Sequence, residues 1–184
     1  MTTISSHRIF GLSGTCRVPG DKSISHRALM LGAMSVGETR IHGLLESDDI
    51  LATVSAITSL GVKVTRLEDQ TWQVFGCGIG GMAAPSDVIN MGNSGTGARL
   101  LMGLVSGCPI TVTFMGDESL NTRPMKRVLI PLEQSGAEIL SNDNKLPITI
   151  KGNKIPIPIK YSSSLSSAQV KSCVLLNGLT STGN

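Results

Sequence analysis

Aromatic side chains are scarce in this chain of 184 residues, because Phe, Trp and Tyr together make up only 3% of it. Proteins that grip single-stranded nucleic acids stack bases on aromatic rings, so this scarcity argues against that class of function. The formal net charge of +3 is likewise too small for a protein that binds phosphate backbones. It suits a small anionic substrate that is attracted to a local cluster of cations.

Cysteines and long apolar runs are also in short supply. The cysteines stand far apart without a CxxC pair, which argues against a disulfide or zinc framework and favours a reducing, cytoplasmic location: Cys16, Cys77, Cys108 and Cys173. No apolar run reaches the roughly 18 residues that a membrane-spanning helix needs, and residues 1–8 lack the apolar core of a signal peptide. We therefore expect a globular protein with no metal, no cofactor, and neither membrane nor nucleic acid as a partner.

Small residues and cations are present in the segment Val18–Ala28. We predict that a short strand around Cys16 and Val18 ends at the Pro19–Gly20 turn. An apolar helix that runs to about residue 35 follows this turn.

Lys22 and Arg27 lie on either side of the start of that helix, and Ser23 or Ser25 is expected to cap it. Cations, hydroxyls and free backbone N–H groups at a helix N-terminus form an anion site, and phosphate is a common ligand of such sites. An ordinary capped helix with two solvated cations is an equally good interpretation of these residues alone.

The expected elements follow the order strand, helix, strand, helix, strand, strand, and this order then starts again. A lead-in over residues 1–15 contains a possible strand at 9–12. The first round continues with a strand at 39–44, a helix at 50–60 capped near Ser47, and a hairpin of 62–65 with 71–75. The second has a strand at 87–91, a glycine-rich loop at 92–97, a helix at 98–105, a strand at 110–115, a helix from Pro124 to Gly136, and a hairpin of 137–140 with 147–151. The third begins with a strand at 155–161 and a helix at 169–176.

A repeat underlies this order. Arg27, Arg99 and Lys171 recur at intervals of 72 residues, and so do the small residues at positions 23, 95 and 167. We predict an α/β fold of repeated βαβαββ units packed about a common axis, at about 16–80, 85–152 and 155–184. Three positive helix ends would then converge on one surface. For Arg99 and Lys171 we favour a structural or solvated cation over a ligand.

The third unit of the repeat is truncated, since its second strand, second helix and hairpin are missing. An apolar helix face and a sheet edge would remain uncovered in such a unit. We therefore expect the chain to be a fragment or one half of a split protein.

Four motifs in the chain resemble those of one enzyme family, the 5-enolpyruvylshikimate-3-phosphate (EPSP) synthases. They occur in the order of that family, at Pro19–Ala28, Gly92–Arg99, Gly116–Leu120 with Arg123–Met125, and Ser167–Ser172. The resemblance implies two similar domains, each of three βαβαββ units, with the active site in the cleft between them. Residues 16–184 are similar to most of the N-terminal domain, so the C-terminal half would be a covalent continuation or a separate chain.

The resemblance also implies a reaction, the transfer of the enolpyruvyl group of phosphoenolpyruvate to the 5-hydroxyl of shikimate 3-phosphate with release of phosphate. Lys22 would contact both substrates and is a candidate for proton transfer. The shikimate 3-phosphate site would comprise Lys22, Ser23, Arg27, Ser167 and Gln169. The phosphoenolpyruvate site would comprise Lys22, Asn93, Gly95, Thr96, Arg123 and Gln169. Many members have a serine where this chain has Ala168, so one hydroxyl donor is absent here.

Other interpretations of these residues stay open at this stage. The chain could be a non-catalytic module that binds phosphate esters, or a transferase that acts on a UDP-linked amino sugar, although the Lys22–Arg27 motif speaks against the latter. Without the family resemblance, Arg123 and Gln169 would be assigned to helix starts. His26 is expected to cap a helix or to pack, rather than to bind a metal. The glycine-rich segment Gly76–Gly81 is not followed by the helix that a dinucleotide site requires.

Overall fold

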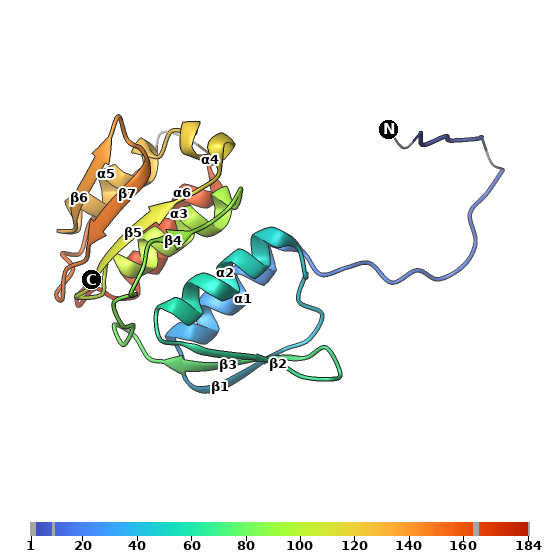
Figure 1. Ribbon diagram of the computed structural model, residues 1–184, viewed down its shortest axis with the longest axis horizontal. Coiled ribbons are helices and arrows are strands. Elements are labelled where there is room, and N and C mark those ends of the chain that lie inside the picture. The colour runs from blue at the N-terminus through green and yellow to red at the C-terminus, as the bar shows by residue number, and fades with distance from the viewer. Residues whose placement is uncertain (1–2, 9, 164–165, 184) are drawn as a thin grey trace.

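A computed structural model describes residues 3–8, 10–163 and 166–183 of the protein. The part of the chain that follows residue 20 forms two α/β layers, which lie side by side in Figure 1. The first layer contains α1 (Lys22–Met34), β1 (Val36–Ile41), α2 (Asp48–Ser59), β2 (Lys63–Arg66) and β3 (Trp72–Cys77). Its antiparallel sheet has the strand order β1-β3-β2.

The second layer contains β4 (Ile89–Asn90), α3 (Gly95–Val105), β5 (Thr111–Met115), α4 (Glu118–Thr122), α5 (Lys126–Gln134), β6 (Glu138–Asn142), β7 (Lys145–Lys151) and α6 (Ala168–Gly178). Its sheet has the order β4-β5-β7-β6, in which β4 and β5 are parallel and the other pairs are antiparallel. The α/β class is therefore as predicted, and the hydrophobic core extends through both layers.

Helix α3 lies at the centre of the fold. It contacts α1 and α2 of the first layer and α5 and α6 of the second. Ten of its eleven residues are buried, from Gly95 to Val105 with the exception of Thr96. A helix that is apolar on all sides must be covered on all sides, and here the surrounding helices cover it. Its N-terminus consequently emerges where the two layers meet.

The hairpin of β6 and β7 closes with two residues in the left-handed region, Asp143 at φ 51° and Asn144 at φ 54°. Asp and Asn tolerate this conformation better than other side chains, which explains the turn that the sequence predicts there. The Asn144 carbonyl accepts a hydrogen bond of 2.9 Å from the Met125 backbone N–H. The hairpin is thereby tied to the chain between α4 and α5.

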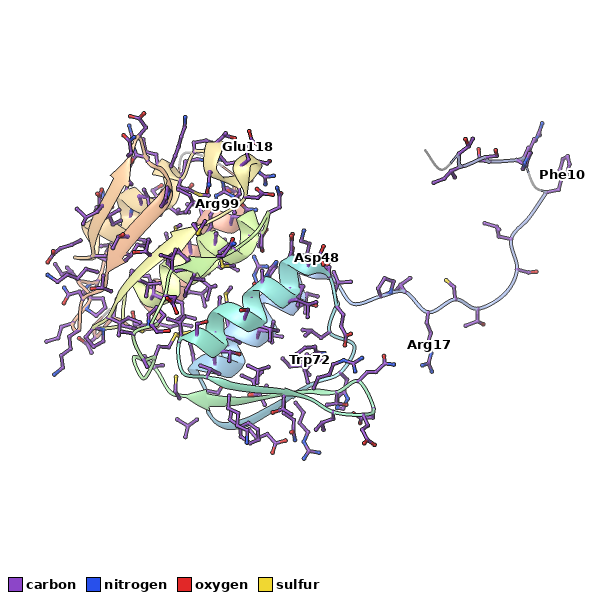
Figure 2. All side chains as sticks on the ribbon, viewed as in Figure 1. Phe10, Arg17, Asp48, Trp72, Arg99 and Glu118 are labelled. Carbon is purple, nitrogen blue, oxygen red and sulfur yellow. The ribbon has the colours of Figure 1, made fainter. Side chains whose placement is uncertain are left out.

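The strand predicted around Cys16 and Val18 is wrong, because residues 10–20 form neither helix nor strand. Figure 2 shows Phe10 and Arg17 on an extended segment that leads away from the two layers, and Val18 is 81% exposed. No strand of the described chain pairs with this segment. Of the strand expected at 9–12, residues 10–12 are not strand either, and residue 9 lies outside the described residues.

The strand predicted at 155–161 is also wrong. Pro156 and Pro158 remove two backbone donors from this stretch, so a regular ladder of hydrogen bonds cannot form along it. The Ile157 N–H does form one bond, to the Ser135 carbonyl oxygen (2.9 Å). The alternation of apolar residues in this stretch therefore does not indicate a strand.

The helix predicted from Pro124 to Gly136 is found as α5. A second, short helix that was not predicted, α4, precedes it, and the two are separated by a break. Arg123 stands in the break with an extended backbone (φ −75°, ψ 136°). The ring of a proline disfavours the helical conformation in the residue before it, and this explains why the helix stops at Arg123.

No helix among the described residues is both long enough and apolar enough to cross a membrane.

The contact between α3 and α6 depends on a glycine. A Cβ atom added at Gly103 would lie 2.3 Å from the Cys173 carbonyl oxygen, whereas one added at Gly178 would meet nothing within 4 Å. We expect Gly103→Ala to lower the free energy of unfolding by about 1–3 kcal/mol, because the two backbones must separate. Gly178→Ala should be neutral or stabilising by up to about 1 kcal/mol. Urea unfolding of both variants measures this difference, and equal effects would contradict the close packing of α3 on α6.

Candidate functional site

Three helices begin next to one another with a capped N-terminus. Asp21 caps α1 by accepting a hydrogen bond from the Ile24 N–H (2.8 Å), Ser94 caps α3, and Ser167 caps α6. The cap of α1 predicted from the sequence, Ser23 or Ser25, is therefore wrong. A carboxylate is an equally common cap, and its negative charge also suits the positive end of the helix.

Lys22 and Arg27 both face neighbouring helices. The Lys22 ammonium forms an ion pair with Asp49 of α2. Arg27 donates from Nη1 to the Ser23 carbonyl oxygen (2.8 Å) and from Nη2 to the Ser172 hydroxyl of α6 (2.6 Å). Both cations thus have partners within the protein, and the Lys22 side chain remains half exposed to solvent.

His26, between these two cations, is fully buried. Its Nδ1 lies 2.8 Å from the Thr53 hydroxyl, which in turn donates to the Asp49 carbonyl oxygen (3.3 Å). The direction of the bond between Nδ1 and Thr53 depends on which ring nitrogen carries the proton, and Nε2 has no partner among the described residues. Burial lowers the pKa of His26 to about 4, with Lys22 and Arg27 acting in the same direction and Asp49 opposing them. His26 is a packing residue, as the sequence suggested.

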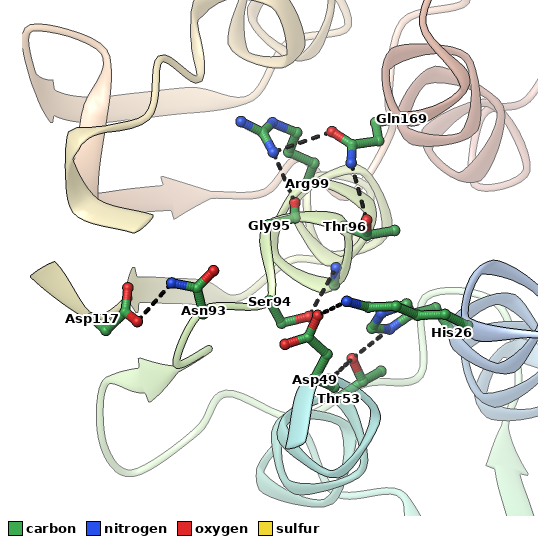
Figure 3. Close-up of polar contacts among 12 residues, drawn as sticks. His26, Asp49, Thr53, Asn93, Ser94, Gly95, Thr96, Arg99, Asp117 and Gln169 are labelled. Atoms are coloured by element: carbon green, nitrogen blue, oxygen red, sulfur yellow. Dashed lines mark hydrogen bonds and ion pairs between the residues drawn. The ribbon is translucent and has the colours of Figure 1, made fainter. Parts of the chain in front are cut away.

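The glycine-rich loop before α3 is held to the break between α4 and α5. Arg123 donates from Nη2 to the Asn93 side-chain oxygen (2.7 Å), and Asn93 donates to Asp117 (2.7 Å; Figure 3). The hydrogen bond from Asn93, followed by that from the Leu120 N–H and the charge of Arg123, lowers the pKa of Asp117. Asp117 is therefore an ionised anchor at neutral pH, and Arg123 is oriented toward the loop.

Gly95, the first residue of α3, lies against two guanidinium groups. A Cβ atom at this position would be 2.9 Å from Arg99 Nη1 and 3.3 Å from Arg123 Nη1. Glycine at this position thus lets the two guanidinium groups lie against the first turn of α3, and any side chain there would displace one of them.

Gln169 joins α6 to α3. Its Nε2 donates to the Thr96 hydroxyl (2.9 Å), and its Oε1 accepts from Arg99 Nη1 (3.1 Å; Figure 3). The Gln169 side chain therefore does not cap the start of its own helix, although the sequence alone would have favoured that role. Arg99 is buried, as expected for a structural cation, and Lys171 is exposed, as expected for a solvated one.

The predicted site residues form two groups. One is built around α1 and α2 and contains Lys22, Ser23 and Arg27. The other is built around the start of α3 and contains Asn93, Gly95, Thr96, Arg123 and Gln169. Helix α6 connects the groups, because Ser172 contacts the first, Gln169 contacts the second, and residues three apart lie on one helix face. Ser167 caps this same helix.

Three partners of these residues were missed in the sequence, namely Asp49, Asp117 and Ser172. Asp49 and Asp117 were visible only as acidic residues at helix starts, where carboxylates are common for local reasons. Ser172 ends the fourth motif, but no spacing rule links it to Arg27, which is 145 residues away.

Chemically, this arrangement suits anions. Guanidinium and ammonium groups lie near the starts of these helices, and the carboxylates of Asp21, Asp49 and Asp117 there already have partners. Within the described residues no group of three or more His, Cys, Asp or Glu side chains could hold a metal ion.

Comparison with known proteins connects this geometry to one family. A family model described as EPSP synthase (3-phosphoshikimate 1-carboxyvinyltransferase) matches residues 8–184. A 3-phosphoshikimate 1-carboxyvinyltransferase of Bradyrhizobium sp. strain BTAi1 is 57% identical over 174 residues, which are 94% of this chain and 39% of that protein. One from Rhodopseudomonas palustris strain BisA53 is 53% identical over 184 residues, which are 99% of this chain and 41% of that protein.

The fold has a counterpart among solved structures. EPSP synthase from Acinetobacter baumannii matches with a TM-score of 0.87 and 41% sequence identity, over 92% of this chain and 39% of that chain. The chain thus spans about two fifths of the length of the relatives that it matches.

The burial of His26 predicts a pH dependence of stability. Its pKa of about 4 in the folded protein lies below the ordinary value of 6.5, so the unfolded state binds the proton more readily. Above pH 6.5 the group has no effect, and stability should fall by on the order of 3 kcal/mol as the pH drops from 6.5 to 4. His26→Asn, whose amide can still donate to Thr53, should lose this component in urea unfolding, whereas His7→Asn in the exposed N-terminal segment should retain it. An unchanged slope in His26→Asn would refute the assignment.

Proposed function

The chain belongs to the EPSP synthase family, and from this membership we propose that it forms the substrate-binding N-terminal part of a 3-phosphoshikimate 1-carboxyvinyltransferase. The observation that carries the proposal is the linkage of three helix starts by site side chains, through Arg27 with Ser172 and Gln169 with Thr96. We further propose that residues 16–184 make up this part, in which β4 to β7 with their helices form one βαβαββ unit, and that residues 1–15 are a lead-in.

In this proposal shikimate 3-phosphate lies over the starts of α1 and α6. Arg27 can give two parallel hydrogen bonds to a carboxylate or phosphate, and its guanidinium is already oriented by Ser23 and Ser172. The capped start of α6, with Ser167 and Gln169, supplies backbone N–H groups toward the phosphate. At Ala168 only the backbone N–H can serve, because the hydroxyl of a serine is absent.

Phosphoenolpyruvate lies at the start of α3. Asn93 holds Arg123 in place there, and Gly95 leaves room for an anion to approach the helix backbone. Thr96 and Gln169 add polar hydrogens on the side of α6. Two polyanions can be brought together only where cations and oriented N–H groups offset their repulsion, and the observed cluster provides both.

The reaction adds the 5-hydroxyl of shikimate 3-phosphate to C2 of phosphoenolpyruvate and then eliminates phosphate. It requires an acid that protonates the methylene carbon and a base that accepts the hydroxyl proton. Lys22 is our candidate for proton transfer, with Asp49 fixing its ammonium. Asp117 is too well stabilised as a carboxylate to serve as the base. We therefore assign the remaining acid–base groups to the part of the enzyme that this chain does not cover, whether continuous with it or a separate polypeptide.

A cytoplasmic location is part of the proposal. The four cysteines are free thiols, and two of them, Cys108 and Cys173, are buried in the core. Free thiols are typical of a reducing compartment.

Phosphate release tests the proposed function. This chain is assayed with both substrates, with and without the C-terminal part of the enzyme. Turnover that depends on adding that part supports a transferase half. Tight binding of phosphate esters by this chain alone, with no gain on complementation, would instead indicate a non-catalytic module. Turnover with a UDP-linked amino sugar in place of shikimate 3-phosphate would indicate the other branch of enolpyruvyl chemistry.

Removing either cation of the first group should strongly lower kcat/KM of the complete enzyme. Lys22→Met loses a proton-transfer group and should cost on the order of 10²–10⁴ in kcat. Arg27→Ala loses charge-assisted hydrogen bonds and should raise KM for shikimate 3-phosphate by on the order of tenfold or more. Both side chains are at least partly exposed, so circular dichroism and the melting temperature should stay unchanged. Lys145→Met on the exposed side of β7 is the control, and full activity in either site variant would remove the assignment.

Gly95→Ala should discriminate between phosphoenolpyruvate and larger mimics such as glyphosate. The added methyl group would press on Arg99 and Arg123 and narrow the opening at the start of α3. A pocket that changes by one methyl group typically shifts binding by about 10–200-fold. We expect the inhibition constant of glyphosate to rise more than KM for phosphoenolpyruvate. Equal losses for both, measured by steady-state kinetics with Gly178→Ala as control, would refute this.

A further inference from the structure

Arg99 is a buried cation without a counter-ion among the described residues. Its side chain is almost fully enclosed (7% exposed), and Figure 2 shows it inside the second layer. Nη1 donates to the Gly95 carbonyl oxygen (3.1 Å) and to Gln169 Oε1 (3.1 Å), and Nη2 donates to the Pro124 carbonyl oxygen (3.3 Å). All three acceptors are neutral, and they come from α3, α6 and the break after α4. The guanidinium therefore joins the three segments that form the proposed phosphoenolpyruvate site.

The guanidinium also decides how the Gln169 amide is oriented. A guanidinium has only donors, so it can face the oxygen of an amide but not its NH₂ group. The Gln169 side chain must consequently present Oε1 to Arg99 and Nε2 to Thr96, and this is the orientation observed. The reversed amide would place donor against donor in a buried position, which is strongly unfavourable.

The orientation of the amide fixes in turn what Thr96 offers. The Thr96 oxygen accepts from Gln169 Nε2 (2.9 Å), so its own hydroxyl hydrogen is left to donate. Within the described residues no acceptor is bonded to that hydrogen, and Thr96 is partly exposed. The second hydrogen of Nε2 is free in the same way. A chain of donors that begins at Arg99 thus ends in two hydrogens beside the partly exposed Thr96, in the first turn of α3.

We propose that Arg99 is a positioning residue that sets the polarity of Gln169 and Thr96, so that both side chains offer hydrogens rather than lone pairs to the anionic substrate. This rests on the proposed function, because the anion is phosphoenolpyruvate. Arg99 does not touch the substrate, and its own hydrogen bonds are all made within the protein. In this proposal the site prefers anions because Arg99, which has only hydrogen-bond donors, orients Gln169 and Thr96 so that both present hydrogens.

The test uses the complete enzyme with Arg99→Met, which removes the donors, and Arg127→Met as the matched control. Arg127 is an exposed neighbour whose charge acts on Arg99 but for which no hydrogen bond is found in the described chain. In Arg99→Met the amide is free to turn its oxygen toward Thr96, whose hydroxyl can then donate to Gln169 instead of to the substrate. We expect KM for phosphoenolpyruvate to rise at least tenfold and KM for shikimate 3-phosphate less than threefold.

A double-mutant cycle tests whether the effect of Arg99→Met on phosphoenolpyruvate binding passes through Thr96. Thr96→Val removes the hydroxyl donor at the end of the chain. If the effect of Arg99→Met passes through Thr96, Arg99→Met should then raise KM for phosphoenolpyruvate by a smaller factor in the Thr96→Val background than in the wild type. Additive losses would overturn the proposal, and so would equal effects of Arg99→Met and Arg127→Met. A parallel rise of both KM values with a lower melting temperature would overturn it as well, because that pattern reflects structure alone.

The proposed function is tested separately by the wild-type enzyme. If wild type turns over phosphoenolpyruvate and Arg99→Met does so equally well, only the positioning role fails. If wild type shows no turnover, the proposed function fails, and the same variants are titrated with inorganic phosphate by calorimetry. At least tenfold weaker phosphate binding in Arg99→Met than in Arg127→Met then supports the donor chain, and equal binding overturns it.

Discussion

The burial of α3 on all sides is the constraint on which the arrangement of the site depends. Because α1 and α2 cover one flank of this helix and α5 and α6 the other, its N-terminus emerges where both layers meet. The starts of α1 and α6 are held beside it by side-chain hydrogen bonds from Arg27 and Gln169. Hydrophobic packing along the helices thus determines where their positive ends lie, and polar contacts at those ends fix the details.

Much of this arrangement was predictable from the sequence. The helix and strand order after residue 20, the glycine-rich loop and the turn at Asp143 and Asn144 follow from periodicity and turn chemistry, which act over a few residues. The errors arose where one local signal competed with another. Apolar alternation at 155–161 predicted a strand, but Pro156 and Pro158 remove the hydrogen bonds that a strand needs. A hydroxyl was expected to cap α1, yet the neighbouring Asp21 carboxylate does so.

The partners of the site residues could not be predicted from spacing. Arg27 and Ser172 are 145 residues apart, and Gln169 and Thr96 are 73 apart. Such pairs follow from tertiary packing, which periodicity does not encode. The family resemblance named the residues that matter, but Asp49 and Asp117, which hold Lys22 and Asn93, emerged only from the geometry. The site roles themselves stay predictions until the variants are measured.

Met125, two residues after Arg123, donates its backbone N–H to Asn144 in the turn between β6 and β7. Surface turns are ordinarily where related proteins differ most freely in length. Here an insertion or deletion would displace the backbone next to Arg123, whose guanidinium bonds to Asn93 of the glycine-rich loop. A change in the length of this distant hairpin turn should therefore move the Arg123 guanidinium and the loop before α3 together.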